Sequence, residues 1–133
     1  MDKKTKSLVQ GYLEKANAKL KVAETLLENK SFDDAVSRAY YCAFHATQAL
    51  LLTEGLSANT HQGVVNLFGL HFVKTNKFDS RFGKHLSNLK DDRETSDYEI
   101  YSPIDKTTAE TAVSEAIEFL AAAENYLAKL IRK

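Results

Sequence analysis

The sequence is poor in residues that break helices or cross-link the chain. Its 133 residues include one cysteine, one proline, five glycines and no tryptophan. A single cysteine, Cys42, excludes an internal disulfide and a cysteine-rich zinc site. Few helix breakers favour a helical protein. No apolar run approaches the roughly 20 residues that span a bilayer, and the N-terminal stretch lacks the apolar core of a signal peptide. We therefore expect a cytoplasmic protein without a membrane segment.

The chain also lacks an excess of charge of either sign. It has 18 Lys and Arg against 18 Asp and Glu, and its formal net charge is zero. This balance excludes a polycation that binds nucleic acid over its whole surface. The neutrality is a cancellation between segments, because residues 61–90 hold five Lys or Arg against one Asp, whereas residues 91–133 hold ten acids against five bases. The zero net charge does not exclude a small, local anion-binding site.

Apolar residues recur every three or four positions along most of the chain, which is typical of amphipathic helices. The length predicts a single domain over residues 1–133. The pattern predicts helices at about residues 4–29, 31–54, 79–92 and 107–132, and a short one that begins at Asn59 or Thr60 and carries Phe72. Residues 93–105 are polar, contain Pro103 and are predicted to form a loop.

The two terminal helices share a repeat close to seven residues, which suits packing at a low crossing angle. Short links favour antiparallel neighbours. We therefore predict an all-α fold, an antiparallel four-helix up-and-down bundle with an additional short helix. Local signals set its helix ends: Ser31 as an N-cap, Gly55 as a terminator, and Thr107 with Glu110 as a capping box.

Polar residues of the second helix fall on one stripe. Asp34, Arg38, Tyr41, His45 and Gln48 are separated by four, three, four and three residues, so they share a helix face. Arginine binds anions through a planar fork, and histidine exchanges a proton near neutral pH. Together with a tyrosine that stacks or donates a hydroxyl, they suit a phosphodiester or a nucleotide. A structural interpretation remains open, in which Asp34 and Arg38 form a helical ion pair and the other residues lie at the bundle edge.

The string Ser37–Ala46, SRAYYCAFHA, resembles the signature of small prokaryotic HEPN-domain proteins. The preceding Phe32–Ala35 and the later Arg93…Asp97-Tyr98 resemble it too, and the likeness covers essentially the whole chain. The resemblance implies a helical bundle that forms homodimers. It also implies a minimal nucleotidyltransferase partner in a toxin–antitoxin or defence system. Active members are metal-independent ribonucleases with an Arg-x4–6-His motif, and their dimer brings two motifs together at a shared cleft.

On this resemblance, Arg38 and His45 are the expected catalytic pair, with six residues between them. Expected substrate contacts are Tyr41 and Asp34, with Arg93 as a second phosphate contact and Tyr98, like Tyr101, as a stacking ring. The expected ligand is RNA or a nucleotide, with no cofactor and no metal.

Two alternatives stay open. Arg38 and His45 can instead be a structural signature, because Ala39 follows the arginine and Thr47 lies two residues after the histidine. In the second alternative, the bundle is a non-catalytic nucleotide- or partner-binding module. The remaining histidines, His61, His71 and His85, are interpreted as surface or helix-end residues.

Overall fold

The chain folds into helices. The structure, a computed structural model, describes residues 1–98 and 104–132. The elements are α1 (Lys3–Glu28), α2 (Phe32–Leu52), α3 (His61–Phe68), the π-helical turn η1 (Gly69–Val73), α4 (Ser80–Tyr98) and α5 (Lys106–Ile131). The described residues contain no strand, which confirms the all-α prediction. Within these ranges, no helix combines the length and apolar character that a bilayer crossing requires.

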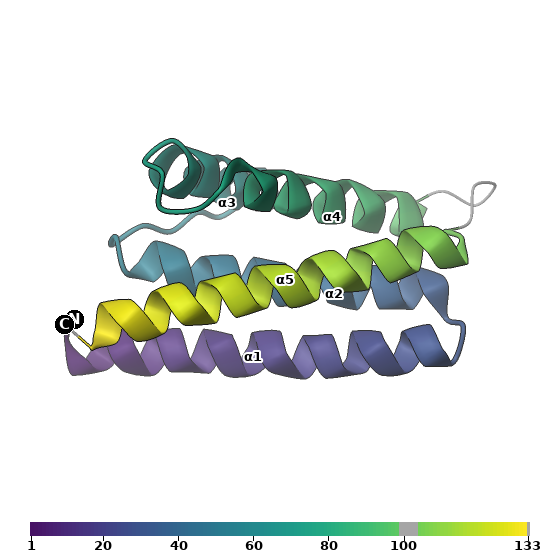
Figure 1. Ribbon diagram of the computed structural model, residues 1–133, viewed down its shortest axis with the longest axis horizontal. Coiled ribbons are helices and arrows are strands. Elements are labelled where there is room, and N and C mark those ends of the chain that lie inside the picture. Colours follow the sequence, from purple (N-terminus) through teal and green to yellow (C-terminus); the bar gives the residue numbers. More distant parts are fainter. Residues whose placement is uncertain (99–103, 133) are drawn as a thin grey trace.

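Four long helices run alternately up and down (Figure 1). Helices α2 and α5 lie in the middle, while α1 and α4 lie on opposite sides and do not contact each other. The short α3 and η1 stand beside the start of α4. This arrangement is the predicted four-helix bundle with an additional short helix.

Helix α2 is the centre of the bundle and packs against α1, α3, α4 and α5. Small side chains make these close approaches feasible, since its buried residues include Ala35, Ala39, Ala43, Ala46 and Ala49. The buried polar side chain Thr47 satisfies its hydroxyl within the helix, by donating to the Ala43 carbonyl at 2.8 Å. One stripe of α2 stays at the surface, and it carries the exposed Asp34 and Arg38.

Local signals located some helix ends correctly. Thr60 caps α3, with its hydroxyl oxygen accepting from the Gly63 backbone N–H at 2.9 Å. Gly55 follows α2 with a φ of +67°, as a helix terminator should. Ser31 occupies the N-cap position of α2, but its side chain makes no capping hydrogen bond.

Two predicted boundaries are wrong. Helix α4 continues to Tyr98, so residues 93–98 are helical rather than a loop; residues 99–103 lie outside the described ranges. Helix α5 begins at Lys106 and is capped by Asp105, whose carboxylate accepts from the Thr108 N–H at 2.8 Å. Thr107 therefore lies inside the helix, and the predicted capping box does not form.

Lys30 ends α1 in a conformation that favours glycine, with a φ of +63°. The Ser31 N–H donates to the Leu26 carbonyl across this turn at 2.9 Å. Since a side chain in the left-handed region costs about 1 kcal/mol, Lys30→Gly should raise the free energy of unfolding by about that amount. Urea denaturation measures it. Lys21→Gly, inside α1, is the control and should lower stability by about 1 kcal/mol. A loss of stability in Lys30→Gly would contradict the assignment of this turn.

Candidate functional site on the open face of α2

The polar stripe of α2 lies at the protein surface. We call it the α2 face and define it by Asp34, Arg38, Tyr41, His45 and Gln48. Asp34 and Arg38 are exposed, and the other three side chains are half-buried. Tyr12 of α1 borders this face at His45, while His61 of α3 and Arg93 of α4 border it at Tyr41. The face is therefore open to a ligand and flanked on both sides by aromatic or charged groups.

His45 is held in one orientation. Its Nδ1 lies 3.1 Å from the Gln48 amide oxygen, so Nδ1 carries the proton and Nε2 keeps its lone pair. The ring stacks on Tyr12 with centroids 6.3 Å apart. Burial lowers the pKa of His45, and the positive charges of Lys15 and Lys19 lower it further, against the opposing effect of the Gln48 hydrogen bond. The imidazole is therefore neutral at pH 7 and suited to accept a proton.

Arg38 has no carboxylate partner among the described residues. The ion pair with Asp34, offered as a structural interpretation, does not form. Arg38 and His45 lie seven residues apart, or about 10 Å along the helix axis. Because an arginine side chain is long, its guanidinium can reach an anion bound close to the imidazole. Asp34 lies one further turn away, near the α1–α2 connection, and is not brought to His45.

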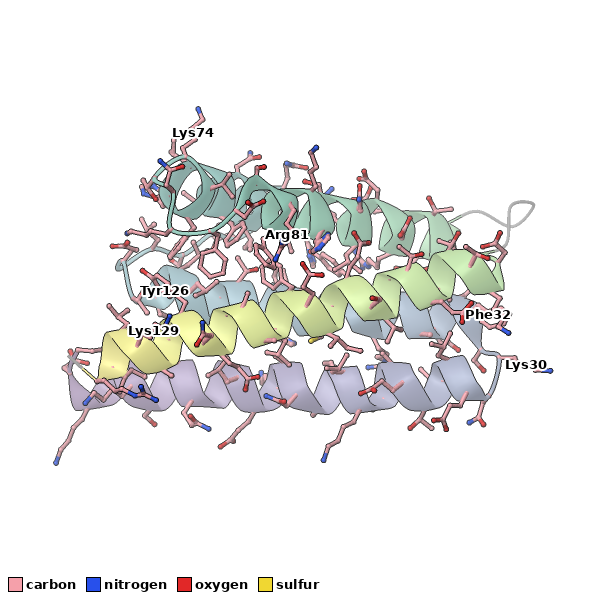
Figure 2. All side chains as sticks on the ribbon, viewed as in Figure 1. Lys30, Phe32, Lys74, Arg81, Tyr126 and Lys129 are labelled. Carbon is pink, nitrogen blue, oxygen red and sulfur yellow. The ribbon has the colours of Figure 1, made fainter. Side chains whose placement is uncertain are left out.

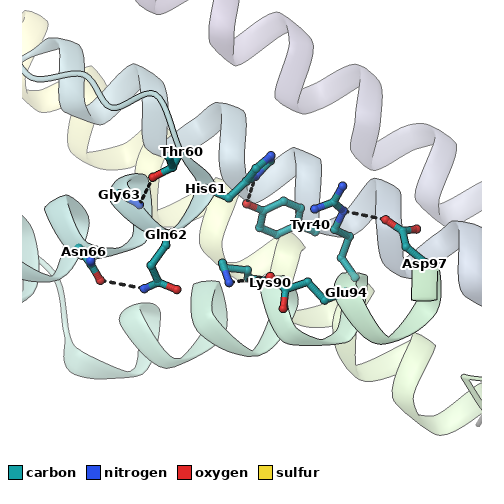
Figure 3. Close-up of polar contacts among 10 residues, drawn as sticks. Tyr40, Thr60, His61, Gln62, Gly63, Asn66, Lys90, Glu94 and Asp97 are labelled. Carbon is teal, nitrogen blue, oxygen red and sulfur yellow. Dashed lines mark hydrogen bonds and ion pairs between the residues drawn. The ribbon is translucent and has the colours of Figure 1, made fainter. Parts of the chain in front are cut away.

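Arg93 meets the α2 face from the neighbouring helix. Its guanidinium carbon lies 5.4 Å from the Tyr41 ring centroid and 5.8 Å from that of Tyr40. The buried Nε lies 3.0 Å from an Asp97 oxygen but makes no aligned hydrogen bond, so the contact is an ion pair (Figure 3). Arg93 thus reaches Tyr41 from α4 rather than from a loop, and its role as a second phosphate contact stays a prediction. Tyr98 ends α4; its side chain, like Tyr101, lies outside the part of the chain that the structure describes.

His61 is the residue that sequence reasoning missed. Its Nδ1 lies 2.6 Å from the Tyr40 hydroxyl (Figure 3), and its ring centroid lies 4.6 Å from that of Phe44. Tyr40 is completely buried, and burial raises the pKa of its phenol. The hydroxyl therefore stays protonated and shares a hydrogen bond with His61 Nδ1. His61 starts α3 as expected of a helix-end residue, but it also ties α3 to α2.

The other reactive side chains serve packing or helix pairing. His85 is half-buried and pairs with Glu115 through Nδ1 at 2.7 Å, joining α4 to α5, so the surface interpretation is wrong for this residue. Cys42 is buried, and burial raises the pKa of its thiol to about 12, which agrees with a small core residue. In the described ranges, no three His, Cys, Asp or Glu side chains are grouped to hold a metal ion.

Comparisons with known proteins identify the family of the chain. The model of the HEPN domain family matches residues 9–126, and the chain belongs to this family. A protein of Methanocaldococcus jannaschii named "Putative toxin" is 36% identical over 120 residues, which are 90% of this chain and 89% of that protein. A Thermotoga maritima protein named "UPF0332 protein" is 33% identical over 132 residues, 99% of either chain.

The Tyr40–His61 hydrogen bond should contribute measurably to stability. Tyr40→Phe removes the hydroxyl without changing the shape of the core, and should lower the free energy of unfolding by about 1 kcal/mol. Tyr126→Phe is the control, since no hydrogen bond of the Tyr126 hydroxyl is found among the described residues. Equal stability of Tyr40→Phe and wild type in urea denaturation would contradict a role for this bond.

The position of His61 also predicts a loss of stability in acid. Burial lowers the pKa of His61, and Arg93 and Lys90 add to the effect. The folded state thus binds the proton less readily than the unfolded chain. The contribution of neutral His61 to the free energy of unfolding is therefore fully present above pH about 6.5 and is lost as the pH falls through the pKa that His61 has in the folded state. His61→Asn should reduce this dependence between pH about 8 and about 5, measured by urea midpoints. His71→Asn serves as control, and an undiminished dependence in His61→Asn would contradict the prediction.

Proposed function

We propose that this chain is a toxin-like HEPN protein and a metal-independent endoribonuclease that acts through the α2 face. The observation that carries the proposal is the pairing of a neutral, oriented His45 with an Arg38 that has no carboxylate partner among the described residues. The name of the M. jannaschii relative supports the toxin-like role. A cytoplasmic location is part of the proposal.

The proposed chemistry uses the nucleophile that RNA itself supplies. Nε2 of His45 accepts the proton of a ribose 2′-hydroxyl, and the 2′-oxygen attacks the adjacent phosphorus. The bond from phosphorus to the 5′-oxygen breaks, and that oxygen takes up a proton from a general acid. Arg38 stabilises the negative charge that develops on the phosphoryl oxygens. This sequence requires no metal ion.

A homodimer would supply the second proton-transfer group. A single chain presents one His45, whereas the reaction needs a base and an acid on opposite sides of the phosphate. Two copies with their α2 faces toward each other would place a second imidazole across the cleft, as the resemblance to active HEPN proteins implies. To act as the acid, that second imidazole must carry a proton on Nε2, which it gives to the leaving 5′-oxygen. A minimal nucleotidyltransferase is the proposed protein partner, acting as the antitoxin.

A non-catalytic binding module is the second candidate. It is favoured by the half-buried rings of Tyr41, Phe44 and His61, which lie 4.6 to 6.1 Å from one another. Aromatic rings beside a guanidinium stack on nucleobases. On this reading the α2 face holds a nucleotide or a partner and leaves the phosphodiester intact.

Cleavage of single-stranded RNA by the purified protein in EDTA separates the two candidates. Wild type should cut, and His45→Ala or Arg38→Ala should slow cutting by about 100-fold or more. The rate should be highest below pH about 6.5 and fall on both sides, because one imidazole must be neutral, the other must be protonated, and the pKa of His45 is lowered. His71→Ala and Arg132→Ala are the matched controls and should cut like wild type.

Two results would decide against the nuclease. Undiminished cutting by His45→Ala would rule out the proposed base. Binding of RNA without any cutting by wild type would replace the nuclease with the binding module.

A further inference from the structure

A second surface lies away from the α2 face, where an open groove of about 550 Å³ runs between α4 and the α3–η1 pair. We call it the α3–α4 groove and define it by Gly69, Leu70, Val73 and Lys74 on one side and Gly83 and Lys84 on the other. None of these residues belongs to the α2 face or contributes to its hydrogen bonds. The groove therefore needs an explanation of its own.

Two glycines and a π-helical turn make the hollow. A Cβ built on Gly69 would meet no atom within 4 Å, so the space beside it is empty. A Cβ on Gly83 would lie 3.3 Å from a Val73 methyl, and glycine thus allows α4 to approach η1 closely. The π-helical turn closes with the Lys74 N–H donating to the Gly69 carbonyl at 2.9 Å. Such turns are frequent at functional sites.

The groove offers apolar surface to solvent. Leu70 is 51% exposed, the largest value among the exposed large hydrophobic side chains described. Val65 and Val73 are half-buried beside it. Isolated exposed leucines are ordinary, but a leucine set on the rim of an apolar groove is an anchor point for another chain.

The rim of the groove is positive. Lys74 and Lys84 line it, and no Asp or Glu does. Neither lysine pairs with a carboxylate among the described residues, whereas the nearby Lys77, Arg81 and Lys90 all do. Figure 2 shows Lys74 extending away from the bundle. Two positive charges without a carboxylate partner among the described residues therefore lie at the groove.

We infer that the α3–α4 groove docks a short amphipathic segment of a protein partner, with an apolar ridge flanked by acidic residues. From Ser80 to Asn88 the groove follows α4 for about 12 Å, the length of two helical turns. An apolar ridge would cover Leu70 and Val73, and carboxylates would meet Lys74 and Lys84. An RNA strand would use the lysines but would gain little from the apolar floor.

Synthetic peptides test the inference on the full chain. The probe is a labelled amphipathic helical peptide with leucines along one stripe and glutamates elsewhere. Its controls are the same peptide with lysines in place of the glutamates, and a scrambled version without the stripe. Fluorescence anisotropy measures binding. Wild type should bind the glutamate peptide and should prefer it to both controls.

Variants then locate the binding. Leu70→Glu should weaken the glutamate peptide at least about tenfold, whereas Leu8→Glu on α1, where the leucine is 46% exposed, should leave binding unchanged. The double variant Lys74→Glu/Lys84→Glu should reverse the preference toward the lysine peptide. Lys4→Glu/Lys6→Glu carries the same change of net charge elsewhere and should not. Circular dichroism checks that each variant is folded.

Three results would overturn the inference. The first is no binding of the glutamate peptide up to about 1 mM. The second is an equal effect of Leu70→Glu and Leu8→Glu. The third is binding of poly(U) RNA that is lost in Lys74→Glu/Lys84→Glu but kept in Leu70→Glu, which would assign the groove to nucleic acid instead.

Discussion

The burial of α2 against four other helices is the constraint on which the rest of the structure depends. Its alanines allow α1, α4 and α5 to approach closely, and each approach covers one part of its surface. A charged side chain on a covered part would need a buried partner, at a cost of several kcal/mol. The charged side chains Asp34 and Arg38 therefore lie on its open face, whereas its buried Tyr40 and Cys42 stay uncharged. Packing and function are thus determined by the same helix.

The neighbours of α2 set the chemistry of that face. Tyr12 and Gln48 fix the ring of His45, while Tyr40 holds His61 at the start of α3. Arg93 covers the tyrosine rings from α4. Desolvation then lowers the pKa of both histidines, and nearby cations act in the same direction. The packing of the helices therefore accounts for neutral imidazoles that lie next to positive charges.

Features with a local cause were predictable from the sequence. The apolar stripes of α1 and α5, the cap at Thr60 and the spacing of Arg38 and His45 all follow from helical geometry, which depends only on neighbouring residues. The end of α4 was mispredicted because its last turns are polar, a composition common to loops and exposed helices. Pairs such as Lys90–Glu94 and Arg93–Asp97 lie along those turns and support a helix there.

Features that join distant segments were not predictable. His61 and Tyr40 are 21 residues apart, and no local pattern indicates that they meet. The same holds for His85 and Glu115, which join α4 to α5. The α3–α4 groove depends on the π-helical turn and on the close approach of Gly83 to Val73, and the hydrophobic period indicates neither.

The proposed chemistry requires that the α2 face present a neutral His45 with a free Nε2. Nuclear magnetic resonance of the imidazole nitrogens across a pH titration measures this directly. We expect that Nδ1 of His45 carries the proton at neutral pH and that the ring titrates below the ordinary histidine pKa of about 6.5. A proton on Nε2, or a pKa above the ordinary value, would contradict it.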